Sequence, residues 1–319
     1  MNMQSLTPVL PLSVIRFNFT VSAPVQLPHY PGSAWRGAFG EAFKKTVCVV
    51  DHVPCGECSL KRSCAYSYVF ETPPPEGAQK MRKYRAAPHP FVLQLHDASG
   101  LSDGHYSIGM ILFGHGHRFF PYIAYAMQRA GSLGIGGKRQ VFTLANIEQC
   151  MLDASTHPVY QQNKLHPLNS GELPRLPPMP QQVKIAIHTP MRIKQNGKHL
   201  DHAHFNFAAF FGSLLRRISM LTYFHTDTPL ETDFAALMQQ ARQIEFNAKQ
   251  LSWYDWTRYS SRQQCEMHMG GVIGTLALDL QGLEALWPYL WLGQWVHAGK
   301  ATSMGMGQYS IAAASLPSF

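Results

Sequence analysis

The stretch HAGKATSMGMGQYSI, residues 297–311, places three glycines around Lys300, Thr302 and Ser303 just before an apolar segment. Glycine-rich loops that hold nucleotide phosphates come before a helix. Here the helical pattern lies before the loop, at 283–292, and the pattern after it, at 308–312, predicts a strand. We therefore expect the loop to join a helix to a final strand.

The same order of patterns occurs once before in the chain. Gly136 corresponds to Gly305, and Val14 corresponds to Val183, at a spacing of 169 residues in each case. A duplicated unit is the simplest explanation. The predicted strands are 13–21, 106–113, 140–144, 183–193 and 271–280, besides 308–312, and the predicted helices are 32–45, 119–130, 205–223 and 283–292.

Each half fits a β-α-β-β-α-β order, although the middle strand pair is less distinct than the rest. We expect an α+β protein with two tandem ferredoxin-like (RRM-like) domains, at 1–164 and 183–319. Residues 165–182 contain five prolines and little periodicity, so they are predicted to be a linker. A Cys-rich insertion at 48–64 interrupts the first domain.

The composition favours a polyanionic partner. The 319 residues include 27 Lys and Arg against 19 Asp and Glu, which gives a formal charge of +8. A basic surface without a specific partner is the alternative interpretation. No long apolar run and no signal-peptide pattern occurs, and the cysteine pattern is unlike a secreted disulfide framework, so we expect a cytoplasmic protein without a membrane partner.

The Cys-rich segment has the spacing Cys48-x6-Cys55-x2-Cys58-x5-Cys64. Four thiolates can close a tetrahedral zinc site and fix a loop that has too little apolar material to fold alone. The pattern predicts a structural zinc. An iron–sulfur cluster remains open because thiolates alone do not distinguish the two, and four reduced cysteines are the plain alternative.

Candidate RNA-binding residues combine cations with glycines and with nearby aromatic residues, a combination that pairs with phosphates and stacks on bases. They are Lys138, Arg139, Arg216, Arg217, Arg258, Arg262, His297, Gly299, Lys300, Thr302, Ser303, Gly305 and Gly307. Two structural alternatives stay open. The loop glycines could serve only to fit a turn, and the arginines at 258 and 262 could pair with nearby carboxylates.

Five stretches of this chain resemble the RAMP superfamily of CRISPR-associated RNA-binding proteins, and within it the repeat-RNA processing endoribonucleases. They are GSAWRG at 32–37, LLRRI at 214–218, RYSSRQ at 258–263, Gly270-Gly271, and GQWVHAGKATSMGMGQY at 293–309. The resemblance implies tandem ferredoxin-like domains that bind a CRISPR repeat hairpin. It also implies metal-independent cleavage of precursor RNA to mature crRNA, in which a ribose 2′-hydroxyl attacks the adjacent phosphate and leaves a 2′,3′-cyclic phosphate.

Members of that family usually take their catalytic groups from the region of the first helix. Such cleavage needs a base, an acid and a cation for the phosphate. In this chain His29 and Tyr30 precede the predicted helix, Arg36 lies in its second turn, and Lys44 and Lys45 lie in its last. We expect His29 to act as base or acid, and Arg36 with a helix-end lysine to bind the phosphate.

Three functions remain open on the sequence. The first is the processing endoribonuclease, which would stay with its product and other CRISPR effector-complex subunits. The second is a non-catalytic crRNA-binding subunit of such a complex. The third, outside the family, is a zinc enzyme using cysteines and histidines. His202 and His204 are the second choice for RNA contact because they precede the third predicted helix as His29 precedes the first.

Overall fold

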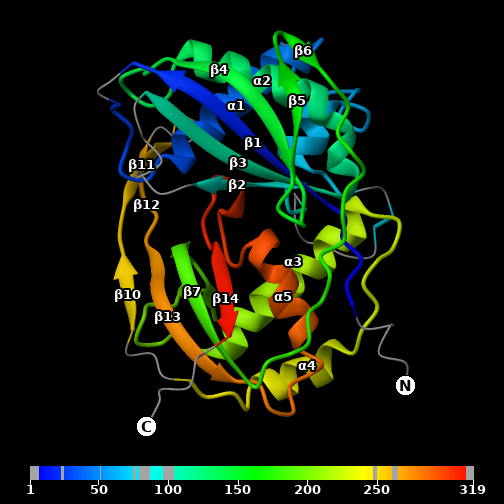
Figure 1. Cartoon of the computed structure of the whole chain (residues 1–319), viewed down its shortest axis with the longest axis vertical. Coiled ribbons are helices and arrows are strands. Elements are labelled where there is room, and N and C mark those ends of the chain that lie inside the picture. The colour runs from blue at the N-terminus through cyan, green and yellow to red at the C-terminus, as the bar shows by residue number, and fades with distance from the viewer. Residues whose placement is uncertain are drawn as a thin grey trace. The chain divides into compact units, whose positions relative to one another are not determined.

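The computed structural model describes residues 7–22, 25–50, 52–74, 77–78, 87–95, 104–246, 250–260 and 265–313. The chain divides into two compact units (Figure 1). The N-terminal unit contains Leu10–Pro174 and Met220–Thr228. The C-terminal unit contains Met1–Val9, Arg175–Ser219 and Pro229–Phe319.

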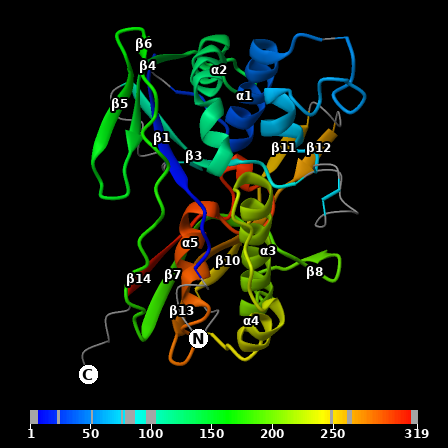
Figure 2. The same ribbon diagram turned by 90° about the vertical axis from the view of Figure 1, so that its right-hand side faces the viewer.

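The described part of the N-terminal unit is one antiparallel sheet with two α-helices, a π-helix and a 3-10 helix. Its elements are β1 (Leu12–Val21), α1 (Gly32–Val47), the π-helix η2 (Ser67–Glu71), β2 (Phe91–Leu95), β3 (His105–Phe113), the 3-10 helix η4 (Gly114–Phe119), α2 (Phe120–Leu133), β4 (Phe142–Cys150), β5 (Thr156–Gln161) and β6 (Lys164–Leu165). Within the described residues the strand order is β2-β3-β1-β4-β5-β6. Figures 1 and 2 show α1 and α2 side by side on one face of this sheet.

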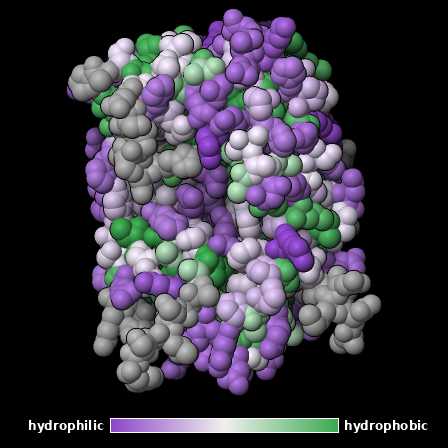
Figure 3. All heavy atoms as spheres, in the orientation of Figure 1, coloured by the Kyte–Doolittle hydropathy of each residue, from purple (hydrophilic) through white to green (hydrophobic). Residues whose placement is uncertain are grey.

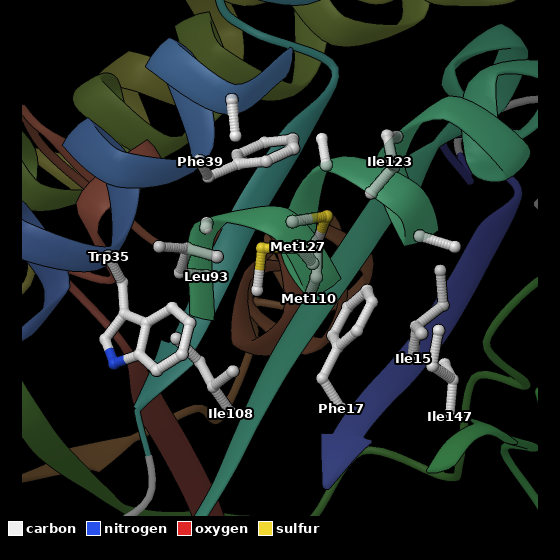
Figure 4. Close-up of a cluster of buried hydrophobic side chains, with 14 of the residues drawn as sticks. Ile15, Phe17, Trp35, Phe39, Leu93, Ile108, Met110, Ile123, Met127 and Ile147 are labelled. Carbon is white, nitrogen blue, oxygen red and sulfur yellow. The ribbon is translucent and has the colours of Figure 1, made fainter. Parts of the chain in front are cut away.

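Alternation along β1 explains how this sheet buries its core. Ile15, Phe17 and Phe19 point to one face and are almost completely buried. They meet Trp35 and Phe39, which lie on one side of α1 because helical residues four apart share a face. Figure 4 shows several of these side chains converging from the strands and the two helices. The contact holds α1 against the sheet.

The C-terminal unit repeats the arrangement, although the last residues of its first helix, from Met220 on, belong to the N-terminal unit. Its elements are β7 (Gln182–Met191), β8 (Lys194–Gln195), β9 (Lys198–His199), α3 (Phe207–His225), α4 (Phe234–Ala241), β10 (Leu251–Tyr254), β11 (Thr257–Ser260), β12 (Cys265–His268), β13 (Gly271–Asp279), α5 (Trp287–Val296), the 3-10 helix η5 (Thr302–Met304) and β14 (Tyr309–Ala313). The main sheet has the order β10-β13-β7-β14. The helices α3 and α5 lie over one of its faces (Figures 1 and 2).

Both sheets confirm the predicted fold class. In the first sheet β1 lies between β3 and β4, with β2 outside β3. In the second sheet β7 lies between β13 and β14, with β10 outside β13. That order, with every neighbour antiparallel, is the ferredoxin-like arrangement. The strand pair β5–β6 extends the first sheet, and the hairpins β8–β9 and β11–β12 are additions to the second unit.

The predicted boundaries were wrong at two elements. The helix expected at 283–292 spans Trp287–Val296, because the chain makes two turns at Leu283 and Leu286 and Pro288 then lies in the first helical turn. Proline is tolerated there since its missing N–H has no partner inside the helix. The strand expected at 140–144 continues to Cys150, where it pairs with both β1 and β5.

The surface is mostly polar on the face shown in Figure 3, where hydrophobic residues form scattered small groups. Isolated apolar residues of this kind are ordinary on protein surfaces. Among the described residues, no helix combines the length and apolar character needed to span a bilayer.

Candidate functional site

The glycine-rich loop joins α5 to β14, as predicted, and its backbone is hydrogen-bonded to the end of β7. The N–H of Lys300 donates to the carbonyl of Arg192 at 2.9 Å, and the N–H of Gly307 donates to that of Pro190 at 3.1 Å. Gly307 has φ 73, and a Cβ there would collide with the carbonyl oxygen of Ala298. The loop therefore needs glycine for its own fold, whatever else it binds.

The polar side chains of the loop differ in exposure. Lys300 is exposed, whereas Thr302 and Ser303 are only 6% and 8% exposed and His297 is fully buried. Of these four, the lysine is the side chain that reaches solvent. A phosphate could still approach the loop through Lys300 and nearby backbone N–H groups.

A basic cluster, formed by Lys300 with Arg192 and Lys194, lies where the glycine-rich loop bonds to the end of β7. Arg192 donates through Nε to Nε2 of His199 at 3.1 Å, and through Nη1 to the carbonyls of His268 and Gly270. Burial, followed by the charges of Arg192, Lys194 and Lys300, lowers the pKa of His199. These three cations share one region of the C-terminal unit.

The second candidate cluster lies on α1 in the N-terminal unit. The guanidinium of Arg36 stands 5.1 Å above the ring of Phe70, and Nζ of Lys44 is 5.7 Å from the centre of the Tyr66 ring. The two rings stack at 5.3 Å. Arg36 also donates through Nη2 to Nε2 of His89 at 3.4 Å. Arg36 and Lys44, which the sequence predicted as site residues, thus each contact one ring of the stacked pair Phe70 and Tyr66.

Two comparisons with protein families cover most of the chain. Residues 10–173 match the AF_1859_N family, an N-terminal domain, and residues 185–309 match the family described as CRISPR-associated endoribonuclease Cas6. Residues 185–309 thus form a Cas6-type domain, and residues 10–173 form an AF_1859_N-type domain. The Cas6 match includes the whole glycine-rich loop and both hairpins of the C-terminal unit.

Solved Cas6 structures share the fold. A Cas6 product complex aligns with a TM-score of 0.60 at 16% identity, over 95% of this chain and 99% of that chain. Thermus thermophilus Cas6 aligns with a TM-score of 0.55 at 16% identity, over the same shares. A Cas6-RT-Cas1–Cas2 complex aligns with a TM-score of 0.55 at 15% identity, over 97% of this chain and 30% of that chain.

A curated relative matches about half of the chain. An uncharacterised protein of Archaeoglobus fulgidus is 22% identical over 173 residues, which is 53% of this chain. The aligned part spans 57% of that relative's length.

The other expected catalytic residues have different surroundings. His29 is exposed just ahead of α1, and Tyr30 is buried, with 6% exposure. Lys45 donates to the carboxylate of Glu41 at 2.8 Å, and this hydrogen bond is the main cause of the lowered pKa of Glu41. Lys45 is therefore already paired with a carboxylate.

The Cys-rich segment begins at the end of α1. The thiol of Cys48 donates to the carbonyl of Val50 at 3.2 Å. Burial is the main cause that raises the pKa of Cys55, and the neighbouring Cys48 and Cys64 add to it. Across the described ranges, no three His, Cys, Asp or Glu residues are gathered closely enough to hold a metal ion. The predicted zinc therefore stays a prediction.

The remaining RNA-binding candidates are dispersed. Lys138 and Arg139 lie exposed in the turn between α2 and β4, and Arg216 is exposed on α3. Arg258 on β11 donates to the sulfur of Met267 at 3.6 Å, and burial lowers its pKa. Arg262 lies outside the described residues.

Sequence reasoning missed the lysines of the β8–β9 hairpin and His89. A signal for the hairpin was present, because Asn196-Gly197 is the dipeptide that a two-residue hairpin turn prefers, and both residues have positive φ. His89 gave no such signal. It lies between two prolines, a context typical of a loop, and only its contacts with Arg36 and Thr72 mark it.

Proposed function

We propose that this protein is a Cas6-type endoribonuclease that binds CRISPR repeat RNA and cleaves the precursor beside the repeat hairpin, without a metal ion, to give mature crRNA. The observation that carries the proposal is the guanidinium of Arg36, held on an aromatic ring and 3.4 Å from an imidazole nitrogen. A cation for the phosphate and a group able to move a proton are the parts that this chemistry needs. Histidine changes charge in the right pH range.

The proposed reaction uses the RNA's own nucleophile. A base removes the proton of a ribose 2′-hydroxyl, and that oxygen forms a bond to the adjacent phosphorus. The bond from phosphorus to the 5′-oxygen breaks, and an acid protonates the leaving oxygen. The products are a 2′,3′-cyclic phosphate and a 5′-hydroxyl. Arg36 would stabilise the added negative charge, with Lys44 beside it, and His29 is the expected base or acid.

Repeat binding is assigned to the C-terminal unit. Arg192, Lys194 and Lys300 concentrate positive charge at the foot of the glycine-rich loop. Phosphate contacts of this kind fix the position of an RNA and carry little sequence information. The product would remain on this surface, where other CRISPR effector-complex subunits could join it.

A non-catalytic crRNA-binding subunit is the second candidate. Tyr30 is buried and Lys45 is paired with Glu41, so two of the five expected catalytic residues have other structural roles. Such a subunit would keep the basic cluster and the loop but would not cleave.

A structural zinc ion in the Cys-rich segment is a separate part of the proposal. Four thiolates suit zinc, and the small contributions of Cys48 and Cys64 to the raised pKa of Cys55 support the nearness of these two thiols to Cys55. The thiols would close further around the ion. The zinc would hold the segment that leads into η2 and so into Phe70, the ring beneath Arg36.

One experiment separates the candidates. End-labelled repeat RNA is incubated with purified protein in excess EDTA, and both cleavage and retention of the RNA are measured. Cleavage supports the endoribonuclease. Retention without cleavage supports the binding subunit. If the RNA is neither cleaved nor retained, the result contradicts both candidates. Arg36→Ala should abolish cleavage in the first case, while Arg16→Ala, on β1 beside Glu148, is the matched arginine control.

A further inference from the structure

Three side chains of the N-terminal unit form a chain of hydrogen bonds that centres on His89. Its Nδ1 lies 3.0 Å from the hydroxyl oxygen of Thr72, and its Nε2 lies 3.4 Å from Nη2 of Arg36. Its ring stacks on Phe91 at 5.9 Å and packs against Phe70. The imidazole is therefore held at both nitrogens and on the ring face that stacks on Phe91.

The partners determine the protonation of this ring. Arg36 has only donors, so Nε2 of His89 must accept its hydrogen bond. A neutral imidazole with an accepting Nε2 carries its proton on Nδ1, which then donates to the hydroxyl of Thr72. The single lone pair of Nε2 is therefore engaged by Arg36, and it becomes available to a ribose hydroxyl once a phosphate binds that N–H of Arg36. An imidazole with a free Nε2 lone pair is the form that a general base requires.

The backbone that holds Thr72 is unfavourable in two ways. The residue ends the π-helix η2 and has φ 42 and ψ 52, in the left-handed region. A β-branched residue is an outlier there, and π-helical turns are rare and often occur at functional sites. Its carbonyl also accepts the N–H of Ala87 at 2.8 Å, which fixes the segment leading to His89. Such strain persists where the surroundings impose it, commonly at active sites.

We propose that His89 is the catalytic base of the site and that Thr72 is its positioning residue. The proposal rests on the proposed function. A phosphate that binds the N–H groups of Arg36 would bring the adjacent ribose close to Nε2. His89 takes the 2′-hydroxyl proton while O2′ bonds to phosphorus and the bond to the 5′-oxygen breaks. The leaving oxygen takes its proton from the acid, for which His29 is then the candidate, and solvent carries the proton of the His89 imidazolium back to that acid.

The first test removes the imidazole and adds it back. His89→Ala should slow single-turnover cleavage of repeat RNA by about 100-fold or more, the usual effect of losing a general base, while RNA affinity stays within about twofold. Free imidazole in the buffer should restore part of the lost rate and leave the wild-type rate unchanged. His166→Ala, at an exposed position of the same unit, is the matched histidine control and should cleave at the wild-type rate.

The second test asks whether the hydroxyl of Thr72 or the shape of its side chain matters for cleavage. Thr72→Ser keeps the hydroxyl and should cleave at a rate near wild type. Thr72→Val keeps the shape and should lose at least about tenfold in rate at unchanged affinity, because the ring loses the partner that orients it. Circular dichroism checks that each variant folds.

The outcomes distinguish failure of the His89 assignment from failure of the proposed function on which it rests. If the wild-type protein does not cleave repeat RNA, the proposed function fails. If the wild type cleaves and His89→Ala cleaves within threefold of it, the assignment of His89 is wrong. A slow His89→Ala that imidazole does not rescue, together with a Thr72→Val that cleaves normally, also contradicts it, since both results would indicate a structural histidine.

Discussion

The buried guanidinium of Arg217 donates its Nε–H to the carbonyl oxygen of Val296 at 2.6 Å, one residue before the buried imidazole of His297. The contact ties α3 to the end of α5 where the glycine-rich loop begins. Burial and the charge of Arg217 lower the pKa of His297 to about 3, and burial lowers that of Arg217 to about 9. At neutral pH the arginine is charged and the histidine is neutral.

This pair predicts a loss of stability in mild acid. Between about pH 6.5 and pH 3 the unfolded chain binds a proton at His297 and the folded protein does not, so the free energy of unfolding falls as the pH is lowered. The contribution is fully present above pH 6.5. Between pH 7.5 and pH 5.5 the free energy of unfolding should fall by about 1 kcal/mol because of His297, as measured by urea unfolding.

His297→Asn is the control, because asparagine does not titrate. The variant should be less stable than wild type at pH 7.5. The difference between the two proteins in free energy of unfolding should be about 1 kcal/mol smaller at pH 5.5 than at pH 7.5. A gap that is the same at both pH values would contradict the buried, neutral state of His297.

Gly307→Ala should destabilise the C-terminal unit strongly. The residue has φ 73, and a Cβ would collide with the backbone of Ala298. Gly197→Ala is the matched control, since Gly197 also has positive φ (80) but nothing within 4 Å of its Cβ position. Gly197→Ala should lower the free energy of unfolding by about 1 kcal/mol, from the backbone conformation alone. Gly307→Ala should lower it by at least twice as much. Equal losses in urea unfolding would remove the steric argument.

Periodicity predicted most of the fold, and its failures have physical causes. The strand β1 and the helices α1 and α3 each bury one face, so their patterns are clear. By contrast, α5 is apolar on nearly every side, as the burial of Trp287, Tyr289 and Leu290 shows, and its pattern could not fix where it begins. The short strands β2 and β10 have too few residues for a distinct period.

The candidate site was predictable only in part. Arg36 and the loop could be found because residue type and chain order mark them. His89 could not, because its contacts with Arg36 and Thr72 join residues that are 53 and 17 positions away in the chain. The burial of Thr302 and Ser303 was equally hidden, since small polar residues in a glycine-rich stretch look exposed in sequence.

Lys300→Ala should weaken binding to all RNAs of similar shape. One lost phosphate contact lowers the magnitude of the slope of log K against log salt by about 0.7 to 0.9. Lys164→Ala, on the exposed β5–β6 strand pair of the other unit, is the matched lysine control and should leave the slope unchanged. If Lys300→Ala also leaves affinity and slope unchanged, the loop has a structural role alone.

The Cys-rich segment should carry about one zinc ion per chain, as four-thiolate sites do. Elemental analysis of protein purified without added metal measures it, and a visible absorption band would reveal an iron–sulfur cluster instead. Cys55→Ser should lose the metal. Cys265→Ser, an exposed cysteine outside the segment, should keep it. Fully folded wild-type protein without metal would contradict the site.

The nature of the nucleophile is tested most directly with a modified substrate. Repeat RNA with a single 2′-deoxyribose on the 5′ side of the scissile phosphate is compared with unmodified RNA, both in EDTA, and the products are identified by mass spectrometry. We predict that unmodified RNA gives a 2′,3′-cyclic phosphate and that the deoxy substrate binds with similar affinity but is not cleaved. Cleavage of the deoxy substrate at the normal rate, or cleavage of unmodified RNA only when a divalent ion is supplied, would contradict the account.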